Sequence, residues 1–227
     1  MAYATPHHVR EYLKAACLRI CHDFALRCQR RPASEKHAFV KRTKEIDLHA
    51  SIGTFFGPVS HLSAQGCGEI DLIVDAPTIR AEVKFFRPPA QAWANLNGDW
   101  NWLLSVTNNG KEFRKRAWVV FWPGRSIARF PACLTVTKSQ GNNFALADYA
   151  PFAPYVELVM PKKGVNQLLA FKSETDVPRT ALLRLPNGKR VFVEIVGSVC
   201  HPVWCAIYSR LTPNEANTLK FDAEIDI

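Results

Sequence analysis

The sequence predicts an α/β protein in which a mixed β-sheet is flanked by helices and followed by a β-rich C-terminal extension. Three observations predict this fold class. Apolar residues near the N-terminus recur at three- and four-residue steps, two segments between residues 69 and 85 alternate with period two, and the last third holds short strand-like runs. Because these spacings match a buried helix face and a pleated strand, we expect a core in residues 1–129 and a β-rich extension or small second domain in residues 130–227.

Two helices are expected before the first strand. Over residues 9–28 the apolar side chains are spaced as on one buried helix face. Pro32 then breaks the pattern, and a second helix is expected over residues 34–49. The glycines and the proline that follow end the helical pattern and leave room for a short strand over residues 54–62.

Later elements are predicted from apolar runs and turn signals. A helix is expected over residues 90–104, and the continuous apolar run 117–122 indicates a strand buried on both faces. The order to this point is helix, three strands, helix and strand. Asn187-Gly188 is a strong hairpin signal between two later runs. The strand-like runs of the last third are 155–160, 167–171, 181–185 and 190–196.

The most informative stretch is the pair of alternating segments 69–75 and 79–85. With an even loop over residues 75–78, Val74 pairs with Ile79 and all apolar side chains except one share a face. A three-residue loop would mix polar and apolar side chains on both faces. We therefore expect a hairpin with the even loop, one apolar face that packs on a helix, and one polar face.

Three chemically useful side chains share the polar face in this register. Asp71 lies directly opposite Glu82, and Lys84 lies diagonally across from Asp71. Two carboxylates at this spacing form a hard oxygen site that suits Mg²⁺, and a lysine beside them can offset negative charge in a transition state. The alternative is a solvated sheet face whose cross-strand ion pairs contribute little.

The same hairpin residues resemble the signature of a known protein family. Gly-Glu-Ile-Asp-Leu-Ile at residues 68–73, followed after a turn by Ala-Glu-Val-Lys at residues 81–84, resembles the signature of the PD-(D/E)xK, or restriction endonuclease-like, nuclease superfamily. The nearest likeness is to Holliday-junction-resolvase-like and small bacterial endonuclease-like members. The predicted order of helix, three strands, helix and strand also resembles the core of that family. The resemblance covers about residues 33–123.

The resemblance implies a metal-dependent nuclease that hydrolyses DNA phosphodiester bonds with Mg²⁺ or Mn²⁺. It makes Asp71 and Glu82 metal ligands, the carbonyl of Val83 a third ligand, and Lys84 the catalytic lysine. The sequence departs from the family pattern in that no proline precedes Asp71.

Many members of the family add a glutamate from an upstream helix. Glu35, at the start of the second predicted helix, fits that place best. Glu45 is nearer to Asp71 in the sequence and stays an alternative. The identity of this fourth residue is open.

The charge balance agrees with a nucleic-acid partner. The chain has 29 Lys and Arg against 20 Asp and Glu, a formal net charge of +9, which attracts polyanions. We expect phosphate contacts from two basic clusters, with solvated loops as the alternative. The residues concerned are Arg31 and Lys36 in one cluster, and Lys111, Arg114, Lys115 and Arg116 in the other.

Other classes of protein are disfavoured. Seven scattered cysteines, an odd number, suit reduced thiols in a cytoplasmic protein. No apolar run is long enough for a membrane span, and neither a P-loop nor a Gly-x-Gly-x-x-Gly motif occurs. Two rival functions stay open, a non-catalytic DNA-binding or scaffold protein that keeps the nuclease fold and a nuclease toxin or defence factor. Whether the chain forms a homodimer is also open.

Overall fold

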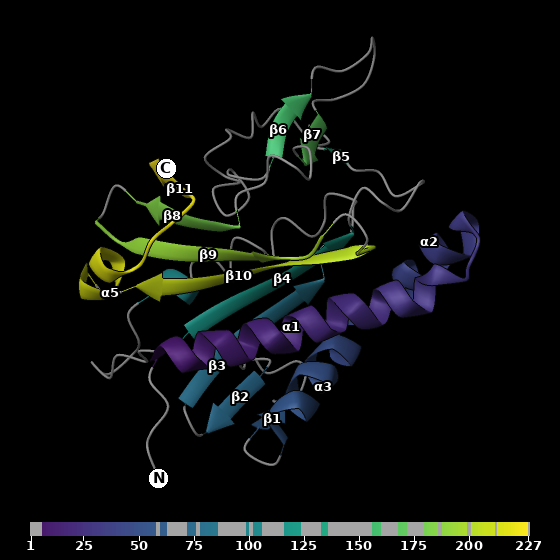
Figure 1. Ribbon diagram of the computed structural model, residues 1–227, viewed down its shortest axis with the longest axis horizontal. Helices are drawn as coiled ribbons and strands as arrows, with labels where there is room; N and C mark the ends of the chain where they lie inside the picture. Colours follow the sequence, from purple (N-terminus) through teal and green to yellow (C-terminus); the bar gives the residue numbers. More distant parts are fainter. Residues whose placement is uncertain are drawn as a thin grey trace.

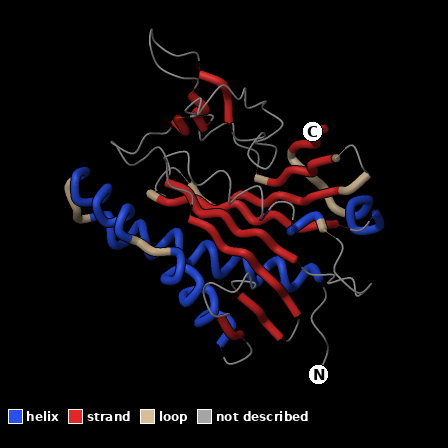
Figure 2. Tube along the Cα trace, turned by 180° about the vertical axis from the view of Figure 1, so that it is seen from behind, coloured by secondary structure: helices blue, strands red, loops and turns tan. Residues whose placement is uncertain are grey.

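The described part of the chain has a mixed α/β fold, in which eight strands form one sheet and three more form a second, smaller sheet. Helices α1 and α3 lie along one face of the large sheet (Figures 1 and 2). The computed structural model describes residues 6–57, 60–62, 72–75, 78–85, 99, 102–105, 116–123, 133–135, 156–159, 168–171, 179–185, 188–198, 201–211 and 213–226.

Helix α1, Pro6–Gln29, confirms the first predicted helix. Its apolar stripe packs on the sheet, and this contact accounts for the helix because a long amphipathic segment is stabilised mainly by the face it buries. The buried members of the stripe are Leu13, Ala16, Cys17, Ile20, Cys21 and Phe24. An ion pair of 2.5 Å between Lys14 Nζ and Glu194 Oε1 also joins α1 to strand β9, Arg190–Val196.

The second predicted helix proves to be two helices, α2 over Ala33–Arg42 and α3 over Glu45–Phe56. Between them the backbone of Thr43 is extended, with ψ 128°, and Lys44 follows with ψ 154°. The expectation of one helix over residues 34–49 was therefore wrong. The break is stabilised at the start of α3, where the Lys44 N–H donates to Asp47 Oδ2 at 3.0 Å.

Helix α3 also runs further than the glycines suggested. It passes through Gly53 and ends at Gly57, whose φ of 68° suits glycine. A glycine inside a helix costs about 1 kcal/mol, and the burial of Leu48 and Ile52 against the sheet offsets that cost. The predicted strand is accordingly shorter, β1 over Ser60–Leu62.

The central hairpin has the predicted register. Strand β2, Leu72–Asp75, pairs antiparallel with β3, Thr78–Phe85, and Val74 lies opposite Ile79. Strand β4, Arg116–Pro123, runs parallel to β3 and confirms the predicted strand over residues 117–122. A parallel neighbour needs a crossover connection, and the helical residues 99 and 102–104 lie between these two strands in sequence.

The C-terminal part continues the same sheet. Strand β10, Val203–Leu211, pairs antiparallel with both β4 and β9, so the sheet order is β1-β2-β3-β4-β10-β9-β8-β11. The predicted β-rich character is present, but these strands are continuous with the N-terminal ones across the expected boundary at residue 130. The remaining elements of this part are β8 Thr180–Arg184, α5 Pro213–Thr218 and β11 Ala223–Asp226.

Strands β10 and β11 and helix α5 were not predicted, whereas the β8–β9 hairpin was. In that hairpin the Leu185 N–H donates to the Lys189 carbonyl at 3.0 Å, and Gly188 takes a φ of 75°. The smaller sheet has the order β5-β7-β6 and is antiparallel. Its strands are β5 Cys133–Thr135, β6 Val156–Val159 and β7 Leu168–Phe171.

Both faces of the central strands are buried. The face toward α1 and α3 carries Val119 and Phe121, while the opposite face carries Trp118 and Tyr208, whose ring centroids lie 5.0 Å apart. This burial explains the continuous apolar run of β4, because a strand covered on both faces shows no alternation. Among the described residues, no helix is sufficiently long and apolar to span a membrane.

Two histidines link α1 to the segment between β9 and β10. His201 Nε2 and His22 Nδ1 lie 3.0 Å apart, and His201 Nδ1 lies 3.3 Å from the Ser198 hydroxyl. Burial, followed by the nearby His22 and Arg179, lowers the pKa of His201. The folded protein therefore resists protonation of a side chain that the unfolded chain protonates near pH 6.5.

This histidine pair predicts an acid-sensitive stability. As pH falls below about 6.5, the unfolded chain binds a proton at His201 that the folded chain does not, so the free energy of unfolding decreases. Above that pH His201 is neutral in both the folded and the unfolded chain, so none of this stability is lost. Urea unfolding of the wild type and of His201→Gln between pH 7.5 and 5 measures it, and the wild type is expected to lose more stability than the variant. Parallel pH profiles would contradict the assignment to His201.

Candidate functional site

The polar face of β3 holds the described part of the predicted site. Along this strand Ala81, Val83 and Phe85 are buried against the helices, and Glu82 and Lys84 alternate with them on the opposite face. Glu82 and Lys84 are partly buried, with side chains 13% and 21% exposed. This is the period-two arrangement expected from the sequence.

Lys84 lies between two carboxylates. Its Nζ is 3.9 Å from Glu82 Oε2 and 3.9 Å from Asp99 Oδ2. The Asp99 side chain is 16% exposed, so all three groups are largely shielded from water. Charges interact more strongly in such surroundings than at an open surface, and the two carboxylates together hold the ammonium at a defined place.

Asp99 was missed by sequence reasoning, although a signal for it exists. It precedes the fully buried Leu103 by four positions, which is about one helical turn. A carboxylate on the core-facing side of an apolar helix is unusual, and that placement could have marked it.

Arg116 and Lys189 hold the segment 102–105 beside β4. The Arg116 Nη1 donates to the carbonyl of Trp102, and to the carbonyl and hydroxyl of Ser105 at 3.2 and 2.7 Å. Its guanidinium lies 4.9 Å from the centre of the Trp102 ring, and Lys189 Nζ donates to the Leu104 carbonyl at 2.9 Å. Burial, then Arg210 and Arg80, lower the pKa of Arg116. These contacts give Arg116 a structural role beside its predicted phosphate contact, which stays a prediction.

Helix α3 binds the edge of β3 through two side chains one turn apart. The Phe85 N–H donates to Glu45 Oε1 at 3.2 Å, and His49 Nε2 donates to the Val83 carbonyl at 3.1 Å. Glu45 is thus the upstream glutamate that contacts the strand of the site. The Val83 carbonyl, predicted as a metal ligand, accepts this hydrogen bond from His49, and its role as a ligand stays a prediction.

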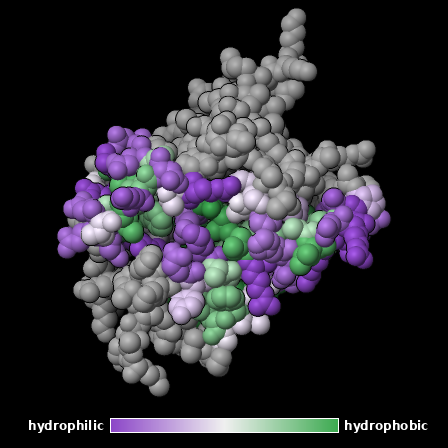
Figure 3. Space-filling model, viewed as in Figure 1, coloured by the Kyte–Doolittle hydropathy of each residue, from purple (hydrophilic) through white to green (hydrophobic). Residues whose placement is uncertain are grey.

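The remaining predicted residues are distributed as follows. Glu35 is exposed in the first turn of α2. Arg31 is exposed with its guanidinium 5.2 Å from the Phe39 ring centre, and Lys36 is half-buried. Strongly hydrophilic side chains cover this end of the helical face (Figure 3). Outside the described residues lie Asp71, Lys111, Arg114 and Lys115.

The donor chemistry suits a hard divalent cation. Glu82 offers carboxylate oxygens and Val83 a carbonyl oxygen, which are ligands that Mg²⁺ accepts. Within the described residues, no group of three or more His, Cys, Asp and Glu side chains is placed to hold a metal ion. The predicted partner of Glu82, Asp71, lies outside the described residues.

No family model, curated protein or solved structure matched this chain. The case for a function consequently rests on the residues themselves.

Proposed function

We propose that the chain is a Mg²⁺-dependent nuclease that hydrolyses DNA phosphodiester bonds at the polar face of β3. The observation that carries the proposal is the placement of Lys84 within 3.9 Å of both the Glu82 and Asp99 carboxylates, on a strand whose register continues toward Asp71. The restriction endonuclease-like core stays part of the proposal. Its support is the order α3, β1, β2, β3, helical segment, β4, with β4 parallel to β3.

Each residue has a separate role in the proposed reaction. Asp71 and Glu82 hold the cation, with the Val83 carbonyl as an additional ligand. A bound Mg²⁺ supplies an activated water and offsets charge on the phosphate. Lys84, positioned by Asp99, stabilises the negative charge that develops as water attacks phosphorus and the bond to the leaving oxygen breaks. The products are a phosphomonoester and a free hydroxyl.

The rival function, a DNA-binding or scaffold protein without activity, has one observation in its favour. In the described part of the chain each of the two carboxylates near Lys84 lies within ion-pair distance of that lysine. Such a network could serve stability alone, since ion pairs also occur where no reaction takes place.

Incubation of the purified chain with supercoiled, linear and branched DNA, with Mg²⁺ or Mn²⁺ and with chelator, tests the proposal. We expect cleavage that depends on the divalent cation. Cleavage that persists in chelator would contradict metal dependence. Tight DNA binding without turnover on any substrate would instead favour the non-catalytic protein.

DNA binding should weaken steeply as salt rises. Each phosphate that a lysine or arginine neutralises contributes a slope of about −0.9 in a plot of log affinity against log salt. Replacing Arg114 and Lys115 with Ala is expected to reduce that slope by about two. Arg116→Ala is tested separately by thermal unfolding, because its hydrogen bonds to Trp102 and Ser105 predict a loss of stability. An unchanged salt slope in the Arg114 and Lys115 variant would show that these two residues do not contact DNA phosphates.

A further inference from the structure

Three arginines lie side by side on neighbouring strands of the large sheet. Arg80 of β3 is the register partner of Arg116 of β4. Strand β10 pairs antiparallel with β4, and Arg210 comes directly after the pair of Ser209 and Ala117, so it lies opposite Arg116. The three strands are neighbours in the sheet (Figure 1), and all three arginine side chains are partly exposed. We call these three residues the arginine row.

The arginine row lies on the face of the sheet that carries the candidate site. Ala81 and Ala117, the next residues of β3 and β4, are buried against the helices, and alternation turns their neighbours to the opposite face. Glu82 and Lys84 share that face. Residues lie about 3.3 Å apart along a strand and strands about 4.8 Å apart. The row therefore begins about 7 Å from Glu82 along β3 and extends about 10 Å across the sheet.

The row brings like charges together, and apolar residues continue it on both sides. Ile73 of β2 is the other register partner of Arg80, and Val191 of β9 is the other partner of Arg210. Like charges directly opposite one another on adjacent strands are destabilising. After burial, Arg210 and then Arg80 lower the pKa of Arg116 by the same repulsion. Departures from ordinary charge pairing concentrate at functional sites, and a bound anion removes the cost of this one.

Arg210 has a different position from Arg116 in the contacts it makes. Arg116 holds the segment 102–105 through hydrogen bonds to Trp102 and Ser105. In the part of the chain that the structure describes, the guanidinium of Arg210 makes no hydrogen bond, ion pair or aromatic contact. A guanidinium presents N–H donors in a fixed fork that fits two phosphate oxygens. Arg210 can therefore bind a phosphate directly, and the charges of the other two arginines strengthen the attraction.

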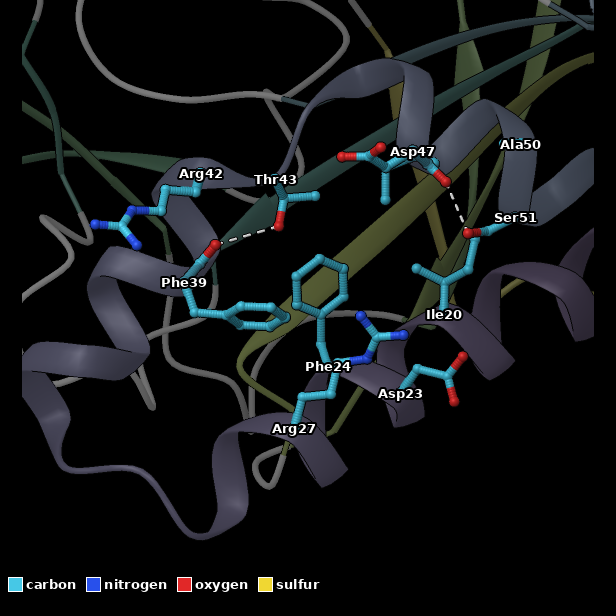
Figure 4. Close-up of a pocket in the computed structure, with 11 residues that line it drawn as sticks. Ile20, Asp23, Phe24, Arg27, Phe39, Arg42, Thr43, Asp47, Ala50 and Ser51 are labelled. Carbon is cyan, nitrogen blue, oxygen red and sulfur yellow. Dashed lines mark hydrogen bonds between the residues drawn. The ribbon is translucent and has the colours of Figure 1, made fainter.

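A second place for an anion is the hollow of about 450 Å³ between α1, α2 and α3 (Figure 4). Arg27 and Arg42 line this hollow, but so do the carboxylates of Asp23 and Asp47. These opposite charges balance, whereas the arginine row carries three positive charges. The row is therefore the more favourable of the two places for a phosphate.

We propose that the arginine row binds a backbone phosphate of a nucleic-acid strand, with Arg210 in direct contact. This phosphate is a neighbour of the one that reacts, because Arg210 lies two strands across and two residues along from Glu82. The choice of a nucleic-acid strand as ligand rests on the proposed function. The row deepens that function by giving the strand a path across the sheet, from β3 toward β10.

DNA affinity as a function of salt tests the proposal, measured with the full chain in chelator so that no metal-dependent cleavage occurs. Arg210→Gln should weaken binding about tenfold and reduce the salt slope by about one. Arg210→Lys should keep the slope, because it retains the charge, but recover only part of the affinity, because lysine lacks the fork. The matched control Arg19→Gln removes an exposed arginine of α1, on the helical side of the sheet, and should change neither.

Thermal unfolding at low ionic strength separates binding from folding. Without a ligand, Arg210→Gln should not lower the unfolding midpoint, because it relieves repulsion within the row. Inorganic pyrophosphate, a compact probe with phosphate oxygens, should raise the midpoint of the wild type and raise that of Arg210→Gln less. The Arg27→Gln and Arg42→Gln variants should respond to pyrophosphate as the wild type does.

Three results would overturn the inference. Unchanged DNA affinity and salt slope in Arg210→Gln would mean that the row does not contact the strand, even if pyrophosphate binds there. An equal loss of affinity in Arg19→Gln would mean a general effect of net charge. Loss of the pyrophosphate response in Arg27→Gln or Arg42→Gln instead would place the anion in the hollow. The two proposals fail separately, because binding that depends on Arg210 without cleavage refutes only the nuclease, and cleavage without that dependence refutes only the arginine row.

Discussion

Replacing Lys84 with Ala is expected to lower the rate of DNA cleavage at least about a hundredfold, the scale seen when one preorganised electrostatic group is removed. Metal binding should survive, because the lysine is not a ligand. Glu82→Gln and Asp71→Asn should lose activity to a similar degree but through weaker metal binding. Cleavage rates and metal titration of the three variants separate these two kinds of loss.

The structure supplies a control for this comparison. Lys220, an exposed lysine between α5 and β11, changes the net charge by the same amount when replaced by Ala and should leave cleavage unchanged. The Glu82 and Lys84 variants should also fold, because these two side chains do not belong to the apolar core of the hairpin. Full activity in Glu82→Gln at saturating Mg²⁺ would refute the assignment of this site.

The β2–β3 register could be predicted because it has a strong physical determinant. A one-residue slip would turn Ile79, Ala81 and Val83 away from the helices and bury Glu82 and Lys84 in their place. The apolar stripe of α1 could be predicted for a similar reason, because its three- and four-residue spacing is that of one buried helix face. Both patterns are local, so the sequence alone displays them.

The break between α2 and α3 could not be predicted from the same kind of pattern. Apolar spacing passes through Thr43 and Lys44, and the break depends on the fit of α3 against the edge of β3 through Glu45 and His49. Such tertiary contacts override local propensity. Strand β10 is a different case. Its apolar run resembles that of β4, so the strand itself could have been predicted from the sequence. Its place between β4 and β9 depends on pairing between distant parts of the chain.

The candidate site was predictable to the extent that it lies on one hairpin. Glu82 and Lys84 share a strand, so their common face follows from alternation. Asp99 and Glu45 come from other elements, and their proximity to β3 depends on how those elements pack. This explains why Asp99 was not identified and why the sequence alone left the choice between Glu35 and Glu45 open.

Gly197→Ala is expected to reduce the free energy of unfolding by about 2–6 kcal/mol. Gly197 follows β9 with a φ of 145°, a conformation that L-residues rarely adopt, and strain of this kind costs about 1–3 kcal/mol. A Cβ would also lie 2.7 and 2.8 Å from Trp204 Cδ2 and Cγ, and overpacking costs about 1–3 kcal/mol more.

The Trp204 ring has little freedom to move away from that Cβ. Its side chain is buried, the guanidinium of Arg179 lies 5.1 Å from its centre, and Arg179 Nη1 donates to the Gly197 carbonyl at 2.7 Å. Arg179 therefore contacts both the Trp204 ring and the Gly197 carbonyl. A shift of the ring would break the contacts that Arg179 makes on both sides.

Gly188→Ala is the matched control. Gly188 also has a positive φ, 75°, but nothing lies within 4 Å of a Cβ built there. Its substitution should cost only the left-handed backbone term of about 1–2 kcal/mol. Urea unfolding of both variants measures the difference that the Trp204 contact makes. Equal losses in the two variants would show that Trp204 yields without cost, and that the packing between Gly197, Trp204 and Arg179 does not constrain the β9–β10 connection.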